Sequence, residues 1–361
     1  MKAAIIGAGF AGNVHAEAIH ACGAEIAVVV CLAEPEAAAF AKKWGIPQWG
    51  EDISLALQDG IDSVHICTPP ATHGALLRRV LAAGKHVVCE KPLCLDAKEA
   101  KQLVELQEAS EKVCALMLNV RYHMACRRAR EIIASGELGR PVLIHGSYLQ
   151  EFAAFPAPLD WRYDPETAGE MRTVTETGTH WLDIVQYITG RKVESVSAQF
   201  GRFHPERILK EGFTYPPDWG VEGEPVHVDS EDAAVISLRY AGGAIGSLVL
   251  SGVSPGRGNY LSLEITCEKG NLWWNEEENN VLQVARKGEG IRKEIFAFGN
   301  GFSDTFTALM RSFYTAVRSG TKDGDYPKFR EGADICGICC AVCESAMQDA
   351  KWVKTGWEGR L

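Results

Sequence analysis

The chain has 361 residues, more than one hydrophobic core usually organises, so two domains are expected. Apolar residues make up 46% and charged residues 23%, which excludes a disordered chain or a fibrous repeat. The net charge is −10, with 37 basic and 47 acidic side chains and no basic run, which argues against a nucleic-acid or anionic-membrane partner. No apolar stretch reaches the ~20 residues of a membrane helix.

The first third of the sequence alternates apolar runs with helical patterns. Continuous Val, Ile and Ala runs such as residues 25–32 are typical of strands buried on both faces of a parallel sheet. The expected strands are residues 2–6, 25–32, 63–68, 86–90 and 113–118, and the expected helices are residues 12–22, 35–44, 73–83 and 96–111, the last capped by Asp96. This alternation predicts a doubly wound parallel sheet with right-handed connections.

After Asn119 the pattern changes to strands with period-two alternation. The expected strands are residues 142–150, 193–203, 233–240, 244–250, 260–266 and 281–286, and the expected helices are residues 124–135, 175–189, 302–318 and 331–350. The turns Ala241-Gly242-Gly243 and Glu268-Lys269-Gly270 indicate hairpins, so the sheet should be mostly antiparallel. Residues 203–228, rich in Pro, Gly and Trp, are expected to form a long loop over a site.

The fold class that follows is an α/β N-terminal domain over residues 1–118 and an α+β domain with a large open sheet over residues 119–361. The apolar N-terminus, residues 1–12, is better explained as a strand and turn than as a signal peptide. Without an export signal, the twelve cysteines are expected to be reduced thiols in the cytoplasm.

Four cysteines in the last expected helix could suggest a metal. Cys336, Cys339, Cys340 and Cys343 form two C-x-x-C pairs, but their spacing is also that of one buried helical face. One continuous helix cannot easily wrap four sulfurs around a tetrahedral ion. We therefore expect these cysteines to pack as small hydrophobic residues and expect no metal.

A glycine pattern opens the chain. The run Gly7-Ala8-Gly9-Phe10-Ala11-Gly12 matches G-x-G-x-x-G and lies between an expected strand and an expected helix. In that context Gly7 permits a tight turn, Gly9 lets the backbone approach a pyrophosphate, and Gly12 lets the helix close on the strand. The positive helix N-terminus then faces the phosphates. This predicts a dinucleotide-binding (Rossmann) domain.

The end of the second strand bears on the choice of cofactor. An acidic residue often contacts the adenosine ribose there, but Cys31 and Leu32 fill that position and Glu34 is the first acid. Glu34 is either a ribose ligand or an exposed residue beside Pro35. The missing positive charge favours NAD over NADP.

Further motifs follow the later strands of the same domain and continue into the second. They are Thr68-Pro69-Pro70 with His73, Glu90-Lys91-Pro92, Asn119-Val120-Arg121-Tyr122, Gly136-Glu137-Leu138-Gly139, Trp161-Arg162, residues 175–183 (TETGTHWLD) and residues 229–232. In this order and spacing the chain resembles, over nearly its whole length, the Gfo/Idh/MocA family, named for glucose–fructose oxidoreductase, inositol dehydrogenase and a rhizopine catabolism protein.

The resemblance implies a set of site residues. The catalytic residues are Lys91, His180 and Glu176, which stands where the family has aspartate. Cofactor-binding residues are Gly7, Gly9, Phe10, Ala11, Gly12, Leu32, Glu34, Thr68, Pro69, His73, Glu90, Lys91 and Asn119. Substrate-binding residues are Lys91, Arg121, Tyr122, Trp161, Arg162, Glu176 and His180. A cis peptide bond at Lys91–Pro92 is also implied.

The residue types suit the oxidation of a secondary alcohol. Histidine has an unperturbed pKa that suits a base, so His180 is a candidate, and a carboxylate one helical turn away can orient it. Lys91 can polarise the oxygen and stabilise developing alkoxide charge. Structural alternatives stay open: Lys91 could be solvated, His180 interior and Glu176 a helix-end charge, and Asp183 could replace Glu176 as the partner of His180. Core or surface positions are the alternative for Arg121, Tyr122, Trp161 and Arg162.

The leading hypothesis is a nicotinamide-dependent dehydrogenase of a sugar, a sugar derivative or an inositol. One alternative is an enzyme that cleaves glycosides through transient oxidation by tightly held NAD. Another is a non-catalytic dinucleotide-binding regulator, which would need neither Lys91 nor His180. Family members commonly pair through the open sheet, so a homodimer or homotetramer is expected.

We predict that NAD binds at least several-fold more tightly than NADP, because no Lys or Arg lies between Lys2 and Lys42 to meet a 2′-phosphate. Titrating both reduced cofactors and following nicotinamide fluorescence measures the two dissociation constants. Tighter binding of NADP would show that a cation distant in sequence reaches the ribose.

Overall fold

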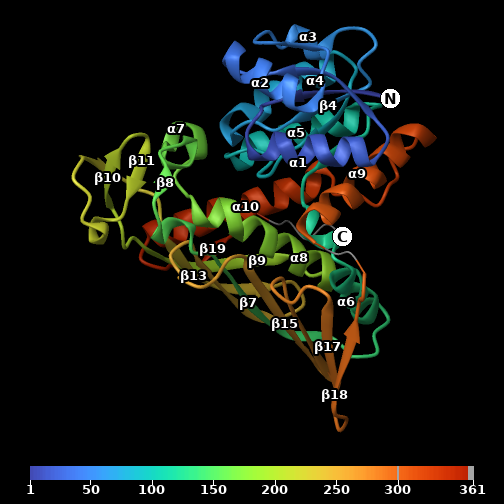
Figure 1. Ribbon diagram of the computed structural model, residues 1–361. Helices are drawn as coiled ribbons and strands as arrows, with labels where there is room; N and C mark the ends of the chain where they lie inside the picture. Colours follow the sequence, from blue (N-terminus) through green and yellow to red (C-terminus); the bar gives the residue numbers. More distant parts are fainter. Residues whose placement is uncertain (299–300, 357–361) are drawn as a thin grey trace. The chain divides into compact units, whose positions relative to one another are not determined.

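The protein is described by a computed structural model, which covers residues 1–298 and 301–356 (Figure 1). It divides into two compact units. Unit 1 comprises residues 1–122 and 301–336, and unit 2 comprises residues 123–300 and 337–361. The sequence pattern predicts one boundary after residue 118 and does not show that residues 301–336 belong to the first unit.

Unit 1 contains a six-stranded parallel sheet in the order β3-β2-β1-β4-β5-β6. The strands are β1 (Lys2–Ile6), β2 (Glu25–Val30), β3 (Gln48–Gly50), β4 (Ser63–Ile66), β5 (His86–Cys89) and β6 (Cys114–Leu116). The helices are α1 (Phe10–Ala21), α2 (Glu34–Trp44), α3 (Ser54–Leu57), α4 (His73–Ala82), α5 (Ala97–Ala109) and α9 (Phe302–Ser319). This is the doubly wound fold that the alternating pattern predicts.

The core of unit 1 combines segments far apart in sequence. Strands β1 and β2 are buried along almost their full length, as their continuous apolar runs predict. Helix α9 adds Phe306, Leu309 and Phe313 to the core that includes α1. Asp96 caps α5 by accepting a hydrogen bond of 2.8 Å from the Glu99 amide, as predicted.

Unit 2 is built on a nine-stranded sheet in the order β18-β17-β16-β15-β7-β14-β13-β9-β19. Its strands are β7 (Pro141–Leu149), β9 (Val193–Gly201), β13 (Ala233–Tyr240), β14 (Ile245–Ser251), β15 (Tyr260–Cys267), β16 (Gly270–Asn275), β17 (Val281–Arg286), β18 (Ile291–Ile295) and β19 (Val353–Lys354). Only the β14–β7 pair is parallel, and the β13–β14 and β15–β16 hairpins are both confirmed. Helices α6 (Met124–Ala134) and α8 (Thr179–Thr189) pack on one face (Figure 1).

The expectation of a loop over residues 203–228 is wrong. This segment forms strands β10 (Glu206–Lys210), β11 (Phe213–Tyr215) and β12 (Glu224–His227), which make a small sheet with β8 (Ala157–Pro158). Its Gly and Pro residues mark short turns between strands of three to five residues, too short to show a clear alternation.

Helix α10 (Phe329–Met347) carries the four clustered cysteines. Cys336 and Cys339 are buried and Cys340 and Cys343 are half-buried, as expected for a packed helical face. Across residues 1–298 and 301–356, no group of three or more His, Cys, Asp or Glu side chains could hold a metal ion. Among the helices of this same part of the chain, none is long and apolar enough to cross a membrane.

Candidate active site

The three glycines of the glycine turn in unit 1 differ in the space around them, and Gly9 alone of the three has room beside its backbone. Gly7 has φ +101°, and a Cβ there would lie 2.6 Å from the Cys67 carbonyl oxygen. A Cβ on Gly12 would lie 2.3 Å from the Gly7 carbonyl oxygen, so both positions require glycine. A Cβ on Gly9 would meet nothing within 4 Å. The backbone is therefore open at Gly9, where α1 begins, and this fits the pyrophosphate of a dinucleotide.

The segment after β2 is solvent-exposed and acidic. Leu32 is 96% exposed and Glu34 begins α2. The Glu34 backbone amide donates a hydrogen bond of 2.9 Å to Glu51 Oε1, so a second acidic side chain reaches this segment. Phe10, at the start of α1, is also exposed, and its ring contacts Phe302. The carboxylates suit ribose hydroxyls and disfavour a 2′-phosphate.

The loops after β4 and β5 are joined by His73. Its Nδ1 lies 2.8 Å from the Pro92 carbonyl oxygen and its Nε2 lies 2.8 Å from the Thr68 carbonyl oxygen. The ring is fully buried, and burial lowers its pKa against the opposing effect of these carbonyl groups. His73 thus fixes the two loops, and its direct contact with a cofactor stays a prediction.

Lys91 lies in the second of these loops. The Lys91–Pro92 peptide bond is cis, as the family resemblance implies. The Lys91 amide donates a hydrogen bond of 3.1 Å to Oε2 of Glu90, which follows β5. Thr68 and Pro69 follow β4 and are half-buried, so they lie at the same edge of the sheet as the glycine turn.

Asn119, Arg121 and Tyr122 are packed inside unit 1. Asn119 Nδ2 donates a hydrogen bond of 2.8 Å to Thr305 Oγ1. An Arg121 Nη1 atom lies 3.7 Å from Glu331, and the Tyr122 hydroxyl donates to the Asp325 carbonyl oxygen. These contacts hold residues 301–336 against the first unit. The predicted cofactor role of Asn119 and substrate roles of Arg121 and Tyr122 stay untested.

In unit 2 the predicted residues Glu176 and His180 occupy consecutive helical turns. A π-helical turn (Val174–Gly178) carries Glu176 and runs directly into α8, where His180 lies in the first turn. π-Helical turns are frequent at functional sites. Both side chains are half-buried. Asp183 is buried one turn further along α8.

Arg162 holds the Glu176 carboxylate. Its Nε lies 2.6 Å from Glu176 Oε1, and its Nη1 lies 2.6 Å from Asp160. Partial burial disfavours the charged guanidinium, but the two carboxylates outweigh it and raise the pKa of Arg162. The guanidinium also lies 4.6 Å from the centre of the Trp161 ring. Trp161, Arg162 and Glu176 are therefore brought together, as predicted.

Tyr148, Gln150 and Asn259 were missed by sequence reasoning. The Tyr148 ring centre lies 6.4 Å from that of His180, and its hydroxyl donates a hydrogen bond of 2.7 Å to Asn259 Oδ1. Gln150 Nε2 donates to the same oxygen at 2.8 Å. Burial raises the pKa of Tyr148, so its hydroxyl stays neutral. The alternation of β7 could have placed Tyr148 on the inner face, but no motif marks it.

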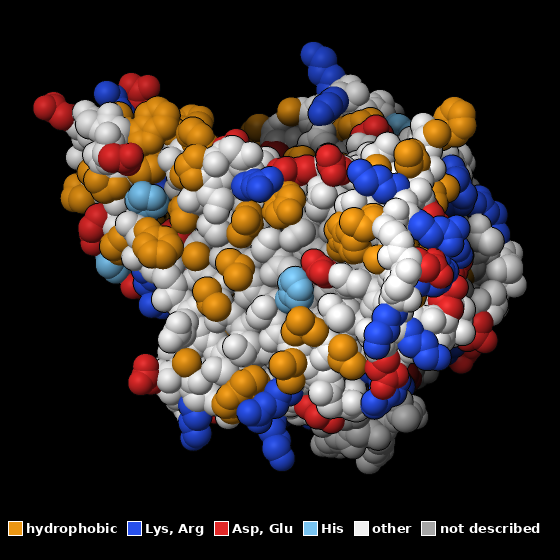
Figure 2. Space-filling view, turned by 90° about the horizontal axis from the view of Figure 1, so that it is seen from below, with side chains coloured by type: hydrophobic (Ala, Val, Ile, Leu, Met, Phe, Trp, Pro, Cys, Tyr) orange, Lys and Arg blue, Asp and Glu red, His pale blue; other side chains and the backbone are white. Residues whose placement is uncertain are grey.

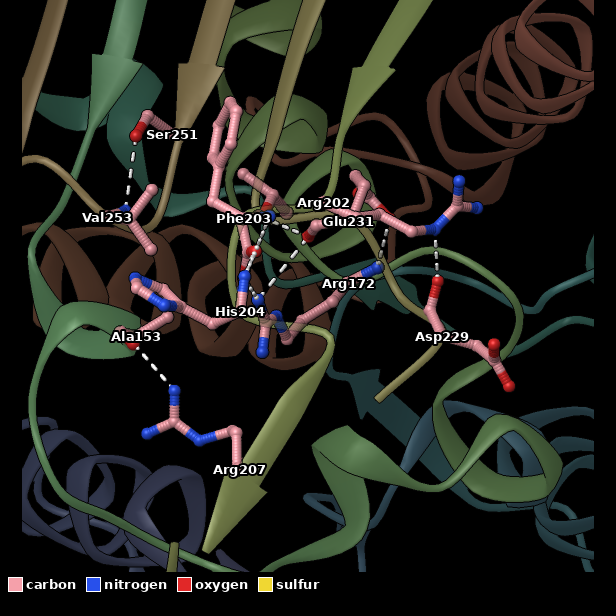
Figure 3. A network of polar contacts seen from close by, with 12 residues as sticks. Ala153, Arg172, Arg202, Phe203, His204, Arg207, Asp229, Glu231, Ser251 and Val253 are labelled. Carbon is pink, nitrogen blue, oxygen red and sulfur yellow. Dashed lines mark hydrogen bonds and ion pairs between the residues drawn. The ribbon is translucent and has the colours of Figure 1, made fainter. Parts of the chain in front are cut away.

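A buried acidic pair fixes the start of the helix that carries Glu176 (Figure 3). Glu231 accepts hydrogen bonds from the Arg172 amide at 3.0 Å and the Val174 amide at 2.8 Å. Asp232 pairs with Arg172 and accepts from the amides of Phe203 and His204. Together these bonds tie the helix start to residues 201–204 and to β13.

Buried Arg207 ties the small sheet to the segment after β7. Its Nη1 donates a hydrogen bond of 2.8 Å to the Ala153 carbonyl oxygen (Figure 3). Its Nη2 donates one of 2.9 Å to the Phe155 carbonyl oxygen. Burial lowers the pKa of Arg207, although the guanidinium remains charged because the unperturbed value is so high. The segment that leads to Trp161 and Arg162 is thereby anchored.

The geometry of unit 1 is that of a dinucleotide-binding domain, and unit 2 places Glu176 and His180 on consecutive helical turns. Comparison with known proteins agrees with this class. Residues 1–118 match the model of an oxidoreductase family with an NAD-binding Rossmann fold, and residues 126–273 match the GFO/IDH/MocA C-terminal domain.

Several relatives match almost the whole chain. Levoglucosan dehydrogenase of Pseudarthrobacter phenanthrenivorans is 30% identical, over 98% of this chain and 97% of its own. Myo-inositol 2-dehydrogenase of Thermotoga maritima is 25% identical, over 89% of each chain. Among solved structures, a levoglucosan dehydrogenase in complex with NADH and L-sorbose gives a TM-score of 0.90 at 28% identity, over 98% of both chains.

The chain belongs to the Gfo/Idh/MocA family of oxidoreductases. It is an NAD-dependent enzyme, and the predicted family, fold class and cofactor are confirmed.

We predict that Glu231→Gln lowers the free energy of unfolding of the protein by about 1–3 kcal/mol, the usual cost of an unsatisfied buried group. A glutamine amide keeps one acceptor oxygen, so one of the Arg172 and Val174 amides would face an NH₂ group. Urea denaturation measures the change. Glu222→Gln, at an exposed position of the same unit, is the control and should be neutral. Equal stability of the two variants would show that Glu231 does not secure the helix start.

Proposed function

We propose that the protein oxidises a secondary alcohol of a sugar, a sugar derivative or an inositol. The observation that carries this proposal is the set of groups around His180. Within unit 2, Tyr148, Trp161, Arg162 and Glu176 offer aromatic faces together with hydrogen-bond donors and acceptors. Such groups suit the apolar and hydroxyl faces of a ring polyol. The names of the relatives, levoglucosan and inositol dehydrogenases, support the same substrate class.

We propose that unit 1 holds the cofactor. Gly7 to Gly12 bind the pyrophosphate, Leu32 and Glu34 flank the adenosine ribose, and the loops with Thr68, Pro69 and Glu90 line the remainder. When bound, NAD supplies the hydride acceptor. His73 keeps the loops after β4 and β5 in place through its two carbonyl contacts.

In the proposed mechanism Lys91 and His180 act on the substrate oxygen. The Lys91 ammonium donates a hydrogen bond to it and stabilises negative charge as the hydroxyl proton leaves. His180 accepts that proton at a ring nitrogen. Glu176 acts through His180 as a positioning residue. The longer glutamate is held by Arg162 at 2.6 Å, which fixes an otherwise mobile carboxylate.

We also propose that the protein pairs through the open face of the nine-stranded sheet. Exposed hydrophobic side chains on this face include Leu143, Val235, Ile245 and Val249. Figure 2 shows hydrophobic side chains spread over the side of the molecule that it presents. A homodimer or homotetramer would cover them. All twelve cysteines are thiols, which supports a cytoplasmic location.

A substrate screen tests the proposed activity. Levoglucosan, myo-inositol, scyllo-inositol and a set of sugar acids are offered with NAD, and NADH absorbance is followed. Stoichiometric NADH formation with one of them is the expected result. Cleavage of a glycoside without net NADH would favour the alternative of transient oxidation. NAD binding without turnover of any substrate would favour a regulator.

We predict that His180→Ala lowers turnover by roughly two to four orders of magnitude, the range of a general base. Lys91→Ala should be comparably damaging and should also raise KM, because the substrate oxygen loses its donor. NAD affinity should change little in His180→Ala, since unit 1 carries the glycine turn. Steady-state kinetics and NAD titration measure both effects.

Matched controls are His145→Ala on β7 and exposed Lys98→Ala on α5, which should both retain wild-type turnover. An active His180→Ala enzyme would contradict the mechanism, because Lys91 alone would then have to manage the proton.

We predict that Glu176→Gln lowers turnover and moves the acid limb of the pH profile of kcat/KM to lower pH. Removing a negative charge beside His180 lowers the pKa of the imidazole, so the neutral base persists at lower pH. Glu176→Asp should keep partial activity, with a weaker hold by Arg162. Exposed Glu166→Gln is the control. A wild-type profile for Glu176→Gln would make Asp183 the partner of His180.

A further inference from the structure

A chain of buried polar side chains runs through unit 1 and ends at Glu90. His15 Nε2 lies 3.2 Å from Glu90 Oε1, and His15 Nδ1 lies 3.2 Å from His65 Nδ1. His65 Nε2 lies 2.9 Å from the Tyr314 hydroxyl. The four residues come from α1, β4, the end of β5 and α9. The mechanism above uses neither histidine.

Burying these four polar side chains lowers the stability of the fold unless their hydrogen bonds are satisfied. His15, His65 and Tyr314 are all 0% exposed, and the Glu90 side chain is 12% exposed. The surroundings are apolar: the His15 ring packs on Phe306 and the His65 ring on Phe313. Polar groups in such a core are destabilising unless their hydrogen bonds are satisfied, and apolar side chains would pack there at lower cost.

The Glu90 carboxylate constrains where the protons lie in this series of hydrogen-bonded side chains. An ionised Glu90 only accepts, so His15 Nε2 must carry a proton. If His15 Nδ1 is bare, it accepts from His65 Nδ1, and His65 Nε2 accepts from the Tyr314 hydroxyl. If His15 is an imidazolium, its Nδ1 donates to His65 Nδ1 and His65 Nε2 donates to the Tyr314 hydroxyl oxygen, while the bond to Glu90 keeps its direction. Both patterns are complete, and in both His15 donates to Glu90.

Glu90 connects the buried histidines to Lys91, because it contacts both His15 and the Lys91 backbone. Its second oxygen, Oε2, accepts from the Lys91 amide at 3.1 Å. The titratable groups that face Glu90 are His15 from α1, His73 from α4, the adjacent Lys91, and the thiols of Cys67 and Cys89. Burial raises the pKa of both thiols well above its usual range, so they are neutral. Burial disfavours the Glu90 anion, but His15 and Lys91 outweigh it and lower the pKa of Glu90.

We propose that Glu90 and His15 are positioning residues for Lys91, because the buried chain fixes a carboxylate that holds the Lys91 backbone. The proposal rests on the catalytic role of Lys91 proposed above. It also links the helix that begins at the glycine turn to the lysine loop, since His15 belongs to α1. The same helix, α1, therefore begins at the predicted pyrophosphate site and carries the histidine that fixes the Lys91 loop through Glu90.

The first test measures the ammonium of Lys91 directly and needs no substrate. Competitive labelling of the full-length protein with acetic anhydride at a series of pH values, read by mass spectrometry, gives the apparent pKa of Lys91, with exposed Lys98 as internal control. Glu90→Gln should lower the apparent pKa of Lys91, because it removes an opposite charge nearby. His15→Gln should lower it less, and Lys98 should not change in either variant.

Kinetics give the second measurement. At saturating NAD, Glu90→Gln and His15→Gln should lower kcat/KM roughly 10- to 100-fold, as expected for a displaced catalytic group, and should move the alkaline limb of the profile to lower pH. His20→Gln, at an exposed position of the same helix, should match the wild type. Tyr314→Phe, at the far end of the chain, should have the smallest effect of the buried variants.

The outcomes separate two kinds of failure. If Glu90→Gln and His15→Gln leave the Lys91 pKa and the alkaline limb unchanged, and only lower the melting temperature, the chain is structural and the inference is wrong. If the Lys91 pKa falls in Glu90→Gln while Lys91→Ala keeps full turnover, the coupling stands and the catalytic role of Lys91 is wrong.

Discussion

Parallel pairing of β1, β4 and β5 is the constraint on which the cofactor side of this enzyme depends. Because all three strands run in the same direction, their carboxyl ends meet at one edge of the sheet, and the loops that follow them must lie together. The glycine turn, the Thr68 loop and the Lys91 loop are thus neighbours although they are separated by up to 84 positions in sequence. His73 then locks two of these loops by its contacts with two carbonyl groups.

In unit 2 the residues around His180 are brought together in a different way. Its strands are mostly antiparallel, so no single edge gathers the loops. The site around His180 instead depends on one helix that lies on the sheet, and the start of that helix is held by buried carboxylates. Glu231 binds two backbone amides of the helix start, and Asp232 pairs with Arg172. The buried Glu231 and Asp232 are tolerated because their oxygens accept hydrogen bonds.

The doubly wound sheet could be predicted from sequence because strands buried on both faces are continuously apolar and the G-x-G-x-x-G run stands between a strand and a helix. The small sheet of β8 and β10–β12 could not, since its strands are short and interrupted by Gly and Pro. Lys91, Glu176 and His180 were predicted as site residues because the order and spacing of their motifs resemble a known family. Tyr148 and Asn259 were not, because the pairing of β7 with β15 brings them together from positions 111 residues apart.

The glutamate at position 176 shows how a change in one motif residue is compensated by a distant segment. One more methylene than aspartate adds a rotatable bond, so an unsupported glutamate carboxylate moves more freely. Arg162 removes that freedom with a contact of 2.6 Å to Glu176, and Asp160 in turn holds Arg162. Arg162 itself lies on a segment that buried Arg207 anchors through Ala153 and Phe155. The reach of Glu176 is thus matched to the position of a loop fixed by a different sheet. Shortening the side chain alone would separate it from that support.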